Sequence, residues 1–261
     1  MDSRCEIMQK ALEFEPYENL VDLVDAASKQ QAPTVSDSVE APAPVTACVS
    51  GTGYAQIPPF AQSLAMDVAT YPTSAYKPRG LRLKLSMRQL AKAKEALIAG
   101  GFVKEIAVEK FLFLAGTDKL YQALQMQLIY RRNVSLEHSF LELLAKHRLQ
   151  ADPMVQKVGI EVPVGTRGAS VDLVANLKNG DRWAFEITCS LNNIAANAAK
   201  LQGQAFYRVI FLCRNHQVRD AAAAILRNAG FDSDFSAKID CILLSALIRQ
   251  QKTFFKERSV S

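Results

Sequence analysis

The spacing of apolar residues along this chain of 261 residues changes from one segment to the next. Residues 4–26 carry apolar side chains at helical spacing, although Pro16 interrupts any single helix. Residues 27–53 are rich in Ala, Pro, Ser and Val and show no sustained period, which is the composition of a flexible linker. We therefore expect an acidic helical segment over residues 1–26 and a linker over residues 27–56.

The next part, residues 57–131, shows short amphipathic helices and a hairpin. We expect helices over residues 58–72, 86–101 and 117–132, a connector with Pro78 and Gly80 over residues 73–85, and two short strands over residues 102–116. The helix after the connector is well delimited, because Ser86 is suited as its N-cap and Gly100 and Gly101 end it. This order of elements is that of a winged helix-turn-helix domain.

From Val134 onward the order of elements becomes α-β-β-β-α-β-α-β. The expected helices are residues 135–149, 191–203 and 218–230, and the expected strands are residues 154–164, 168–178, 181–190, 206–215 and 238–247. The pattern predicts an α/β domain with a mixed central sheet over residues 132–261.

Two carboxylates in neighbouring strands are the first candidates for chemistry. The odd-numbered positions of residues 171–177 are apolar and share one face of the strand, so Asp172 lies on the other face. Residues 183–188 show the same alternation, so Glu186 and Thr188 share the face opposite the apolar one.

The loop between these strands decides whether the two carboxylates meet. A two-residue Asn179-Gly180 turn would place Asp172 on the apolar face. A three-residue loop of Lys178, Asn179 and Gly180, with Gly180 in the left-handed conformation, pairs Asp172 with Glu186. We expect the three-residue loop and neighbouring carboxylates.

A third carboxylate, Glu137, stands on the preceding helix. It lines up with apolar residues three, four and seven positions further along, which directs it toward the core side. Three carboxylates that converge on one pocket require a proton or a cation, and a hard divalent ion such as Mg²⁺ satisfies them through oxygen ligands.

The element order and these carboxylates resemble the PD-(D/E)XK, or restriction-endonuclease-like, superfamily. The resemblance implies a metal-dependent nuclease site in which Asp172 and Glu186 bind Mg²⁺ or Mn²⁺ and Glu137 supports the metal or its water. Thr188 occupies the position of the family's lysine, which positions or activates the attacking water, and Val171 replaces the usual proline. Lys200, on the next helix, is expected to stand in for the missing lysine.

A second resemblance covers roughly residues 60–215. The pairing of LRLKLSMRQLAKAKEALIAGGFV with SLEHSFLELL, ASVDLVANLKNGDRWAFEIT and NAAKLQGQAFYRVIFL resembles the C-terminal region behind some hexameric DNA-translocating ATPases of the HerA and FtsK kind. The chain contains no G-x-x-x-x-G-K-[ST] loop. The resemblance therefore implies either a stand-alone relative or a separate ATPase partner.

Charge is distributed unevenly behind the net value of +5. Residues 1–56 carry three basic and nine acidic side chains, whereas residues 57–131 carry eleven basic and five acidic ones. Between Lys77 and Lys94 there are seven basic residues and no acidic residue. Such a run suits the phosphates of double-stranded DNA, and the expected contacts are Arg79, Arg82, Lys84, Arg88, Lys92 and Lys94. We expect the acidic N-terminal part to restrain DNA binding or to contact a partner.

The five cysteines stand apart from one another without zinc-site spacing, so we expect them to be reduced and mostly structural, Cys189 included. The longest apolar runs are too short to cross a membrane and the first residues do not resemble a signal peptide, so a cytoplasmic protein without membrane contact is expected.

Together these patterns favour a DNA endonuclease or DNA-processing subunit that a winged helix delivers to duplex DNA, and a homodimer is expected because a duplex has two strands to cut. The substitution of Thr188 for lysine leaves two alternatives open. One is a catalytically inactive DNA-binding or adaptor protein that retains the nuclease fold, and the other is a winged-helix transcriptional regulator. Cleavage that depends on Mg²⁺ separates the nuclease hypothesis from both alternatives.

Overall fold

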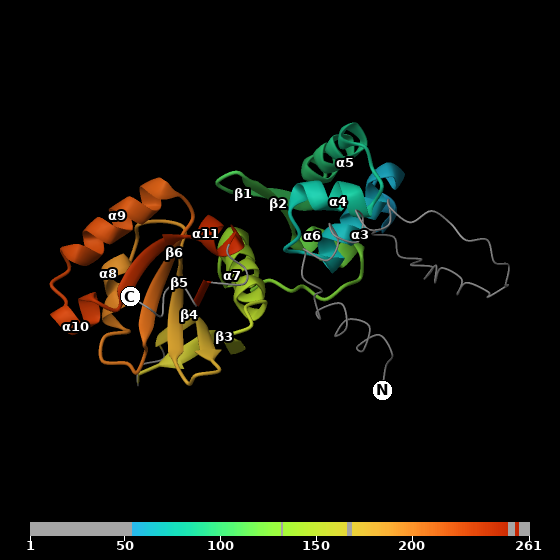
Figure 1. Cartoon of the computed structure of the whole chain (residues 1–261). Coiled ribbons are helices and arrows are strands. Elements are labelled where there is room, and N and C mark those ends of the chain that lie inside the picture. The colour runs from blue at the N-terminus through green and yellow to red at the C-terminus, as the bar shows by residue number, and fades with distance from the viewer. Residues whose placement is uncertain (1–53, 132, 166–168, 250–253, 256–261) are drawn as a thin grey trace, which may run out of the picture. The chain divides into compact units, whose positions relative to one another are not determined.

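The computed structural model describes residues 54–131, 133–165, 169–249 and 254–255. The expected segments over residues 1–26 and 27–53 lie outside this range. The described chain is mixed α/β, with one two-stranded sheet and one five-stranded sheet (Figure 1).

Helices and a hairpin make up the N-terminal part of the described chain. Its elements are η1 (Tyr54–Gln56), η2 (Pro59–Ala61), α3 (Gln62–Thr70), α4 (Tyr76–Arg82), α5 (Met87–Ala99), β1 (Val103–Val108), β2 (Phe111–Gly116) and α6 (Asp118–Ala123). Ser86 caps α5 in a capping box with Gln89, as the sequence predicts for the N-cap.

Two expectations for this part were wrong. The connector contains a helix, α4, because Pro78 falls in the first turn, where its missing N–H group is tolerated. The closing helix α6 ends at Ala123, far short of residue 132. Gln125 takes a left-handed conformation with φ 53, and the N–H group of Met126 donates to the Tyr121 carbonyl at 2.9 Å, which closes the helix.

The C-terminal part follows the expected order, with added short helices. Its elements are α7 (Leu136–Gln150), β3 (Val155–Val164), β4 (Ala169–Leu177), β5 (Arg182–Thr188), α8 (Ile194–Ala199), β6 (Arg208–Cys213), α9 (His216–Arg227), α10 (Ser233–Ser236), β7 (Ile239–Leu243) and α11 (Leu244–Arg249). The last strand is shorter than expected, because the chain turns into α11 directly after Leu243.

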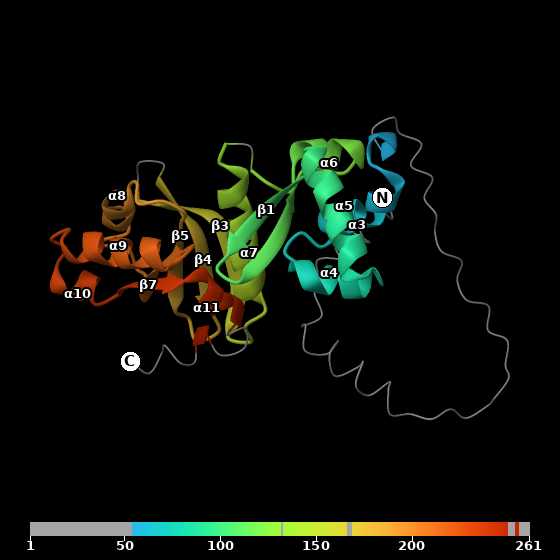
Figure 2. The ribbon, with the colours of Figure 1, turned by 90° about the horizontal axis from the view of Figure 1, so that it is seen from above.

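The five strands lie in the order β3-β4-β5-β6-β7. Strands β3, β4 and β5 are antiparallel neighbours, whereas β5, β6 and β7 run parallel. Helices α8 and α9 cover one face and α7 covers the other (Figures 1 and 2). This arrangement confirms a mixed central sheet between helices.

The alternation of β5 explains how the sheet separates its two faces. Trp183, Phe185 and Ile187 belong to the core on the α7 side, whereas Ala184 belongs to the core on the α8 and α9 side. The first of these cores also contains residues of α3, α5 and α6. The rings of Phe113 and Phe140, for example, lie 5.6 Å apart between their centroids. The helical part and the α/β part therefore share one apolar core.

The loop between β4 and β5 has the geometry predicted from the sequence. Gly180 has φ +92, and the Leu177 N–H group donates to the Asp181 carbonyl at 2.8 Å. The ladder then pairs Asn176 with Arg182 and continues to Leu173 with Phe185. The prediction of a three-residue loop with left-handed Gly180 is confirmed.

Candidate functional site

Asp172 lies where the ladder between β4 and β5 ends. The last pair is Leu173 with Phe185, so the register continued by one residue places Asp172 opposite Glu186. Here the Asp172 side chain replaces a backbone carbonyl as hydrogen-bond acceptor, because its Oδ2 accepts a hydrogen bond from the Ile187 N–H group at 2.7 Å. The contact fixes this carboxylate at the opening between the two strands.

Glu186 is almost completely buried beside Asp172, with 2% of its side chain exposed. Burial and the negative charge of Asp172 raise the pKa of Glu186 to about 7, although a nearby cation opposes the shift. That cation is Lys200, whose Nζ lies 2.9 Å from Glu186 Oε1. Lys200 follows the last residue of α8, a helix that begins after Asn193 in a left-handed conformation. The structure thus brings together Asp172, Glu186 and Lys200, as the sequence predicts.

His138 is a member of this cluster that sequence reasoning missed. It belongs to the first turn of α7, where its N–H group donates to the Ser135 hydroxyl at 3.1 Å. Its Nε2 lies 3.4 Å from Asp172 Oδ1. Hydrogen bonds with Asp172 and with the Cys189 thiol raise the pKa of His138 to about 10, so the imidazole is protonated at neutral pH. No nearby sequence feature marks this contact.

Glu142 is a second missed residue, buried on the same helix. Desolvation by burial raises its pKa to about 7, while Arg131 lowers it and Asp172 adds to the increase. The Nε of Arg131 lies 3.0 Å from Glu142 Oε2. The signal was in the sequence, because Glu142 shares a helix face with Ala145 and Leu149, which are both buried.

The other two expected members of the site have different surroundings. Glu137 Oε1 is a buried atom that lies 2.7 Å from the Nη1 of Arg214, so a guanidinium engages this carboxylate. Glu137 stands in the first turn of α7. Thr188 is buried, and its carbonyl accepts a hydrogen bond from the Arg214 N–H group at 3.2 Å.

Asp172 and Glu186 have the chemistry of a magnesium site. Among the residues that the structure describes, no group of three or more His, Cys, Asp or Glu side chains forms a metal site. Mg²⁺, however, is commonly held by one or two carboxylates and completes its coordination with water and substrate phosphate. Burial is the main cause of the raised pKa of Glu186, so its ionised form is disfavoured despite Lys200, and a bound cation would stabilise it. The two carboxylates therefore fit such an ion.

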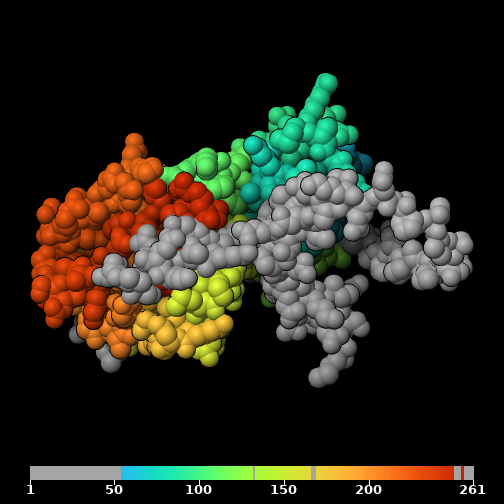
Figure 3. All heavy atoms as spheres, viewed as in Figure 1, coloured from blue at the N-terminus to red at the C-terminus, as the bar shows by residue number. Residues whose placement is uncertain are grey.

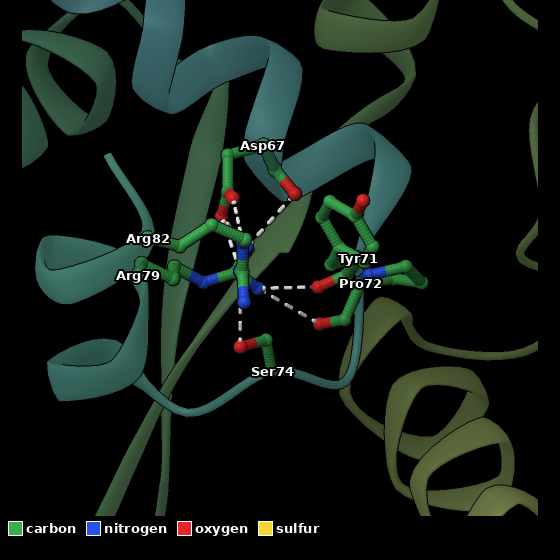
Figure 4. Close-up of polar contacts among 6 residues, drawn as sticks. All are labelled: Asp67, Tyr71, Pro72, Ser74, Arg79 and Arg82. Carbon is green, nitrogen blue, oxygen red and sulfur yellow. Dashed lines mark hydrogen bonds and ion pairs between the residues drawn. The ribbon is translucent and has the colours of Figure 1, made fainter. Parts of the chain in front are cut away.

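Part of the basic run between Lys77 and Lys94 has a structural role (Figure 4). Arg79 is fully buried, and its Nη1 lies 2.6 Å from Asp67 Oδ2. Its Nη2 donates to the Tyr71 and Pro72 carbonyls at 2.8 and 3.2 Å. Arg82 donates to the same aspartate and keeps 32% of its side chain exposed. The expectation that Arg79 contacts DNA was wrong, because this guanidinium is out of reach of solvent.

The remaining cations lie on the surface around α5. Lys84, Arg88 and Lys92 are exposed, and the atoms of α5 lie at the outer surface (Figure 3). Lys94 is half-buried, and its Nζ lies 2.5 Å from Glu105 Oε1 of β1. Lys77 in α4 is exposed as well. We call the surface formed by Lys84, Arg88 and Lys92, with Arg82 beside it, the α5 surface.

Compared with known proteins, the chain matches no family model, no curated protein and no solved structure. No helix within the described ranges is long and apolar enough to span a membrane.

Proposed function

We propose that the chain is a DNA-binding phosphodiesterase whose hydrolytic centre consists of Asp172, Glu186 and Lys200. One observation carries this proposal: the ammonium group of Lys200 lies 2.9 Å from Glu186 Oε1. The register that the β4–β5 loop sets places this same glutamate beside Asp172. A lysine directly after α8 thus supplies the charge that Thr188, in the family's lysine position, cannot supply. The helix and strand order supports a restriction-endonuclease-like domain behind a winged helix.

Asp172 and Glu186 would hold Mg²⁺ or Mn²⁺. When bound, such an ion polarises the phosphoryl oxygen and makes a water molecule a stronger nucleophile. Lys200 keeps a positive charge at Glu186, and this charge would stabilise the negative charge that develops on the phosphoryl group in the transition state. The Ile187 N–H group keeps Asp172 in place, and His138 balances the charge of that carboxylate.

The α5 surface would bring this centre to duplex DNA. Lys84, Arg88 and Lys92 supply affinity for phosphates that does not depend on the DNA sequence and that weakens with salt. In a winged helix, the helix at the position of α5 enters the major groove. We further propose a homodimer and a separate ATPase as partners, which size-exclusion chromatography and co-purification would test.

A catalytically inactive DNA-binding or adaptor protein is the second candidate, and a specific observation favours it. His138 stands beside Asp172 and Lys200 stands beside Glu186, so the two carboxylates already have cations of their own. A centre that serves only stability has the same internal balance. A winged-helix regulator would differ from both by a strong preference for one DNA sequence.

Incubation of supercoiled, linear and branched DNA with Mg²⁺ or Mn²⁺ tests the first proposal. We expect cleavage by the wild type and a loss of at least about 100-fold in Asp172→Asn, which can still accept the Ile187 hydrogen bond. Asp220→Asn, which makes the same change at an exposed carboxylate of α9 paired with Arg219, is the matched control and should keep its activity. Binding without cleavage in every buffer would favour the inactive adaptor.

A further inference from the structure

Arg214 lies at the edge of the proposed centre and has no role in it so far. It directly follows β6, and its N–H group donates to the Thr188 carbonyl at 3.2 Å. Thr188 is two residues beyond Glu186 on the same face of β5, and it pairs with Cys213 in the parallel ladder. The backbone therefore places Arg214 at the ends of β5 and β6, directly beyond Thr188.

The side chain of Arg214 is tied to the other side of the centre as well. Its Nη1 lies 2.7 Å from Glu137 Oε1 in the first turn of α7. The next residue, His138, contacts Asp172 at 3.4 Å. Glu137 thus holds the guanidinium near both site strands, which explains why a carboxylate stands at this position.

Arg214 is more accessible than the two cations that face the site carboxylates. The side chain of Arg214 is 38% exposed, whereas those of Lys200 and His138 are both 22% exposed. Lys200 and His138 each face a carboxylate of the centre itself. A guanidinium offers five N–H donors in a planar fork that matches a phosphate group. The contact with Glu137 is made through Nη1, so donors remain for a second anion.

We propose that Arg214 binds a backbone phosphate of the DNA beside the Asp172–Glu186 centre and that Glu137 is its positioning residue. This inference rests on the proposed function, since it names the substrate contact of the same centre. A phosphate that approaches two carboxylates needs a cation beside them, and Arg214 is more exposed than Lys200. Glu137 therefore acts through Arg214 rather than as a metal ligand.

Binding and hydrolysis can be tested separately. A fluorescent single strand of six nucleotides is titrated in EDTA, with Arg88→Glu and Lys92→Glu present throughout so that the α5 surface contributes little. We expect Arg214→Gln to weaken binding about tenfold and to reduce the salt slope by about 0.7, and Arg214→Lys to restore much of both. The matched control is Arg208→Gln at the other end of β6, where the guanidinium donates to the Ala237 carbonyl. This control should bind as its parent does.

The outcomes separate this inference from the proposed function. Equal binding by Arg214→Gln and its parent, or no binding by the parent in EDTA, would overturn the role of Arg214. Binding that depends on Arg214 without any hydrolysis under Mg²⁺ would refute the enzyme activity and leave the phosphate contact standing.

With hydrolysis present, Glu137→Gln should lower kcat about fivefold and leave KM within about twofold, because it frees the guanidinium without removing it. An unchanged kcat in Glu137→Gln would overturn the positioning role.

Discussion

Two clusters of buried charge in this protein differ in how completely their carboxylates are compensated. Asp67 receives N–H donors from Arg79 and Arg82 on both of its oxygens, at 2.6, 2.7 and 3.0 Å. Glu186 has one ammonium group at 2.9 Å and a second carboxylate, Asp172, beside it. The first cluster ties α3 to α4, whereas the second leaves a carboxylate with a pKa of about 7.

The difference teaches how to tell a structural charge cluster from a candidate site. When one partner of a fully compensated carboxylate is removed, the protein loses stability, because the remaining charges are buried and unpaired. An incompletely compensated one can exchange protons or bind cations near neutral pH, which is what catalytic centres require. The basic run between Lys77 and Lys94 looks uniform in the sequence, yet it contains the buried Arg79, which pairs with Asp67, as well as cations exposed on the surface.

The largest expected effect is the removal of Asp67. In Asp67→Ala the Arg79 guanidinium, which is fully buried, loses its carboxylate. We expect the free energy of unfolding to fall by about 3–5 kcal/mol in chemical denaturation followed by circular dichroism. The double variant Asp67→Ala with Arg79→Met should recover a large part of this loss, since no unpaired charge then remains buried. A loss below about 1 kcal/mol would show that the cluster is dispensable.

The second prediction concerns the pH dependence of stability at Glu186. The pKa of Glu186 is about 7 in the folded state against its ordinary value of 4.5, so the folded state binds the proton more tightly. The stabilisation is therefore complete below about pH 4.5 and is lost as the pH rises through about 7. We expect Glu186→Gln to be more stable than the wild type by about 3 kcal/mol at pH 8 and equally stable near pH 4.

Two controls sharpen this test. Glu142 also has a pKa of about 7, so it contributes to the pH dependence of the wild type's stability. The variant Glu142→Gln measures this contribution, which can then be subtracted. Mg²⁺ added at pH 8 should stabilise the wild type and not Glu186→Gln, if the carboxylates hold the ion. Parallel stability curves of wild type and Glu186→Gln across this pH range would contradict the description of Glu186 as undercompensated.

Local rules in the sequence were sufficient for the strands of the second cluster. Alternation in residues 171–177 and 183–188 assigned the faces, and the length of the Lys178-Asn179-Gly180 loop fixed the register that the ladder confirms. Lys200 was also found, because helical spacing placed it toward the sheet.

Contacts between distant segments were beyond these rules. The burial of Arg79 depends on Asp67 and on the carbonyls of a turn that the alternation of apolar residues does not describe. His138 meets Asp172 only because α7 packs at the end of the opening between β4 and β5. Each of these contacts is a property of packing and not of periodicity, so a sequence pattern could not reveal it.

The third prediction concerns the exposed cations, in contrast to the buried Arg79. Arg88→Glu combined with Lys92→Glu should weaken duplex binding about 50-fold at 0.1 M salt and reduce the slope of log affinity against log salt by about 1.8. The double variant Arg227→Glu with Lys238→Glu changes the same number of exposed charges on the α/β part and is the matched control. Fluorescence anisotropy across a salt series measures both. If both double variants weaken binding equally, the α5 surface has no special role.

The smallest expected effect separates backbone strain from site geometry by comparing one glycine from each part of the chain. Gly180 has φ +92 in the loop between the site strands, and Gly101 has φ +71 after α5; neither has an atom within 4 Å of an added Cβ. Alanine at either position should therefore cost about 1 kcal/mol of unfolding free energy through the backbone alone. Gly180→Ala can relieve its strain by changing the loop, and this would move Asp172 relative to Glu186. We thus expect the pKa of Glu186, followed by NMR titration of its side-chain carboxyl carbon, to fall in Gly180→Ala and to stay near 7 in Gly101→Ala. An equal shift in both variants would mean that the loop does not set the register of the site.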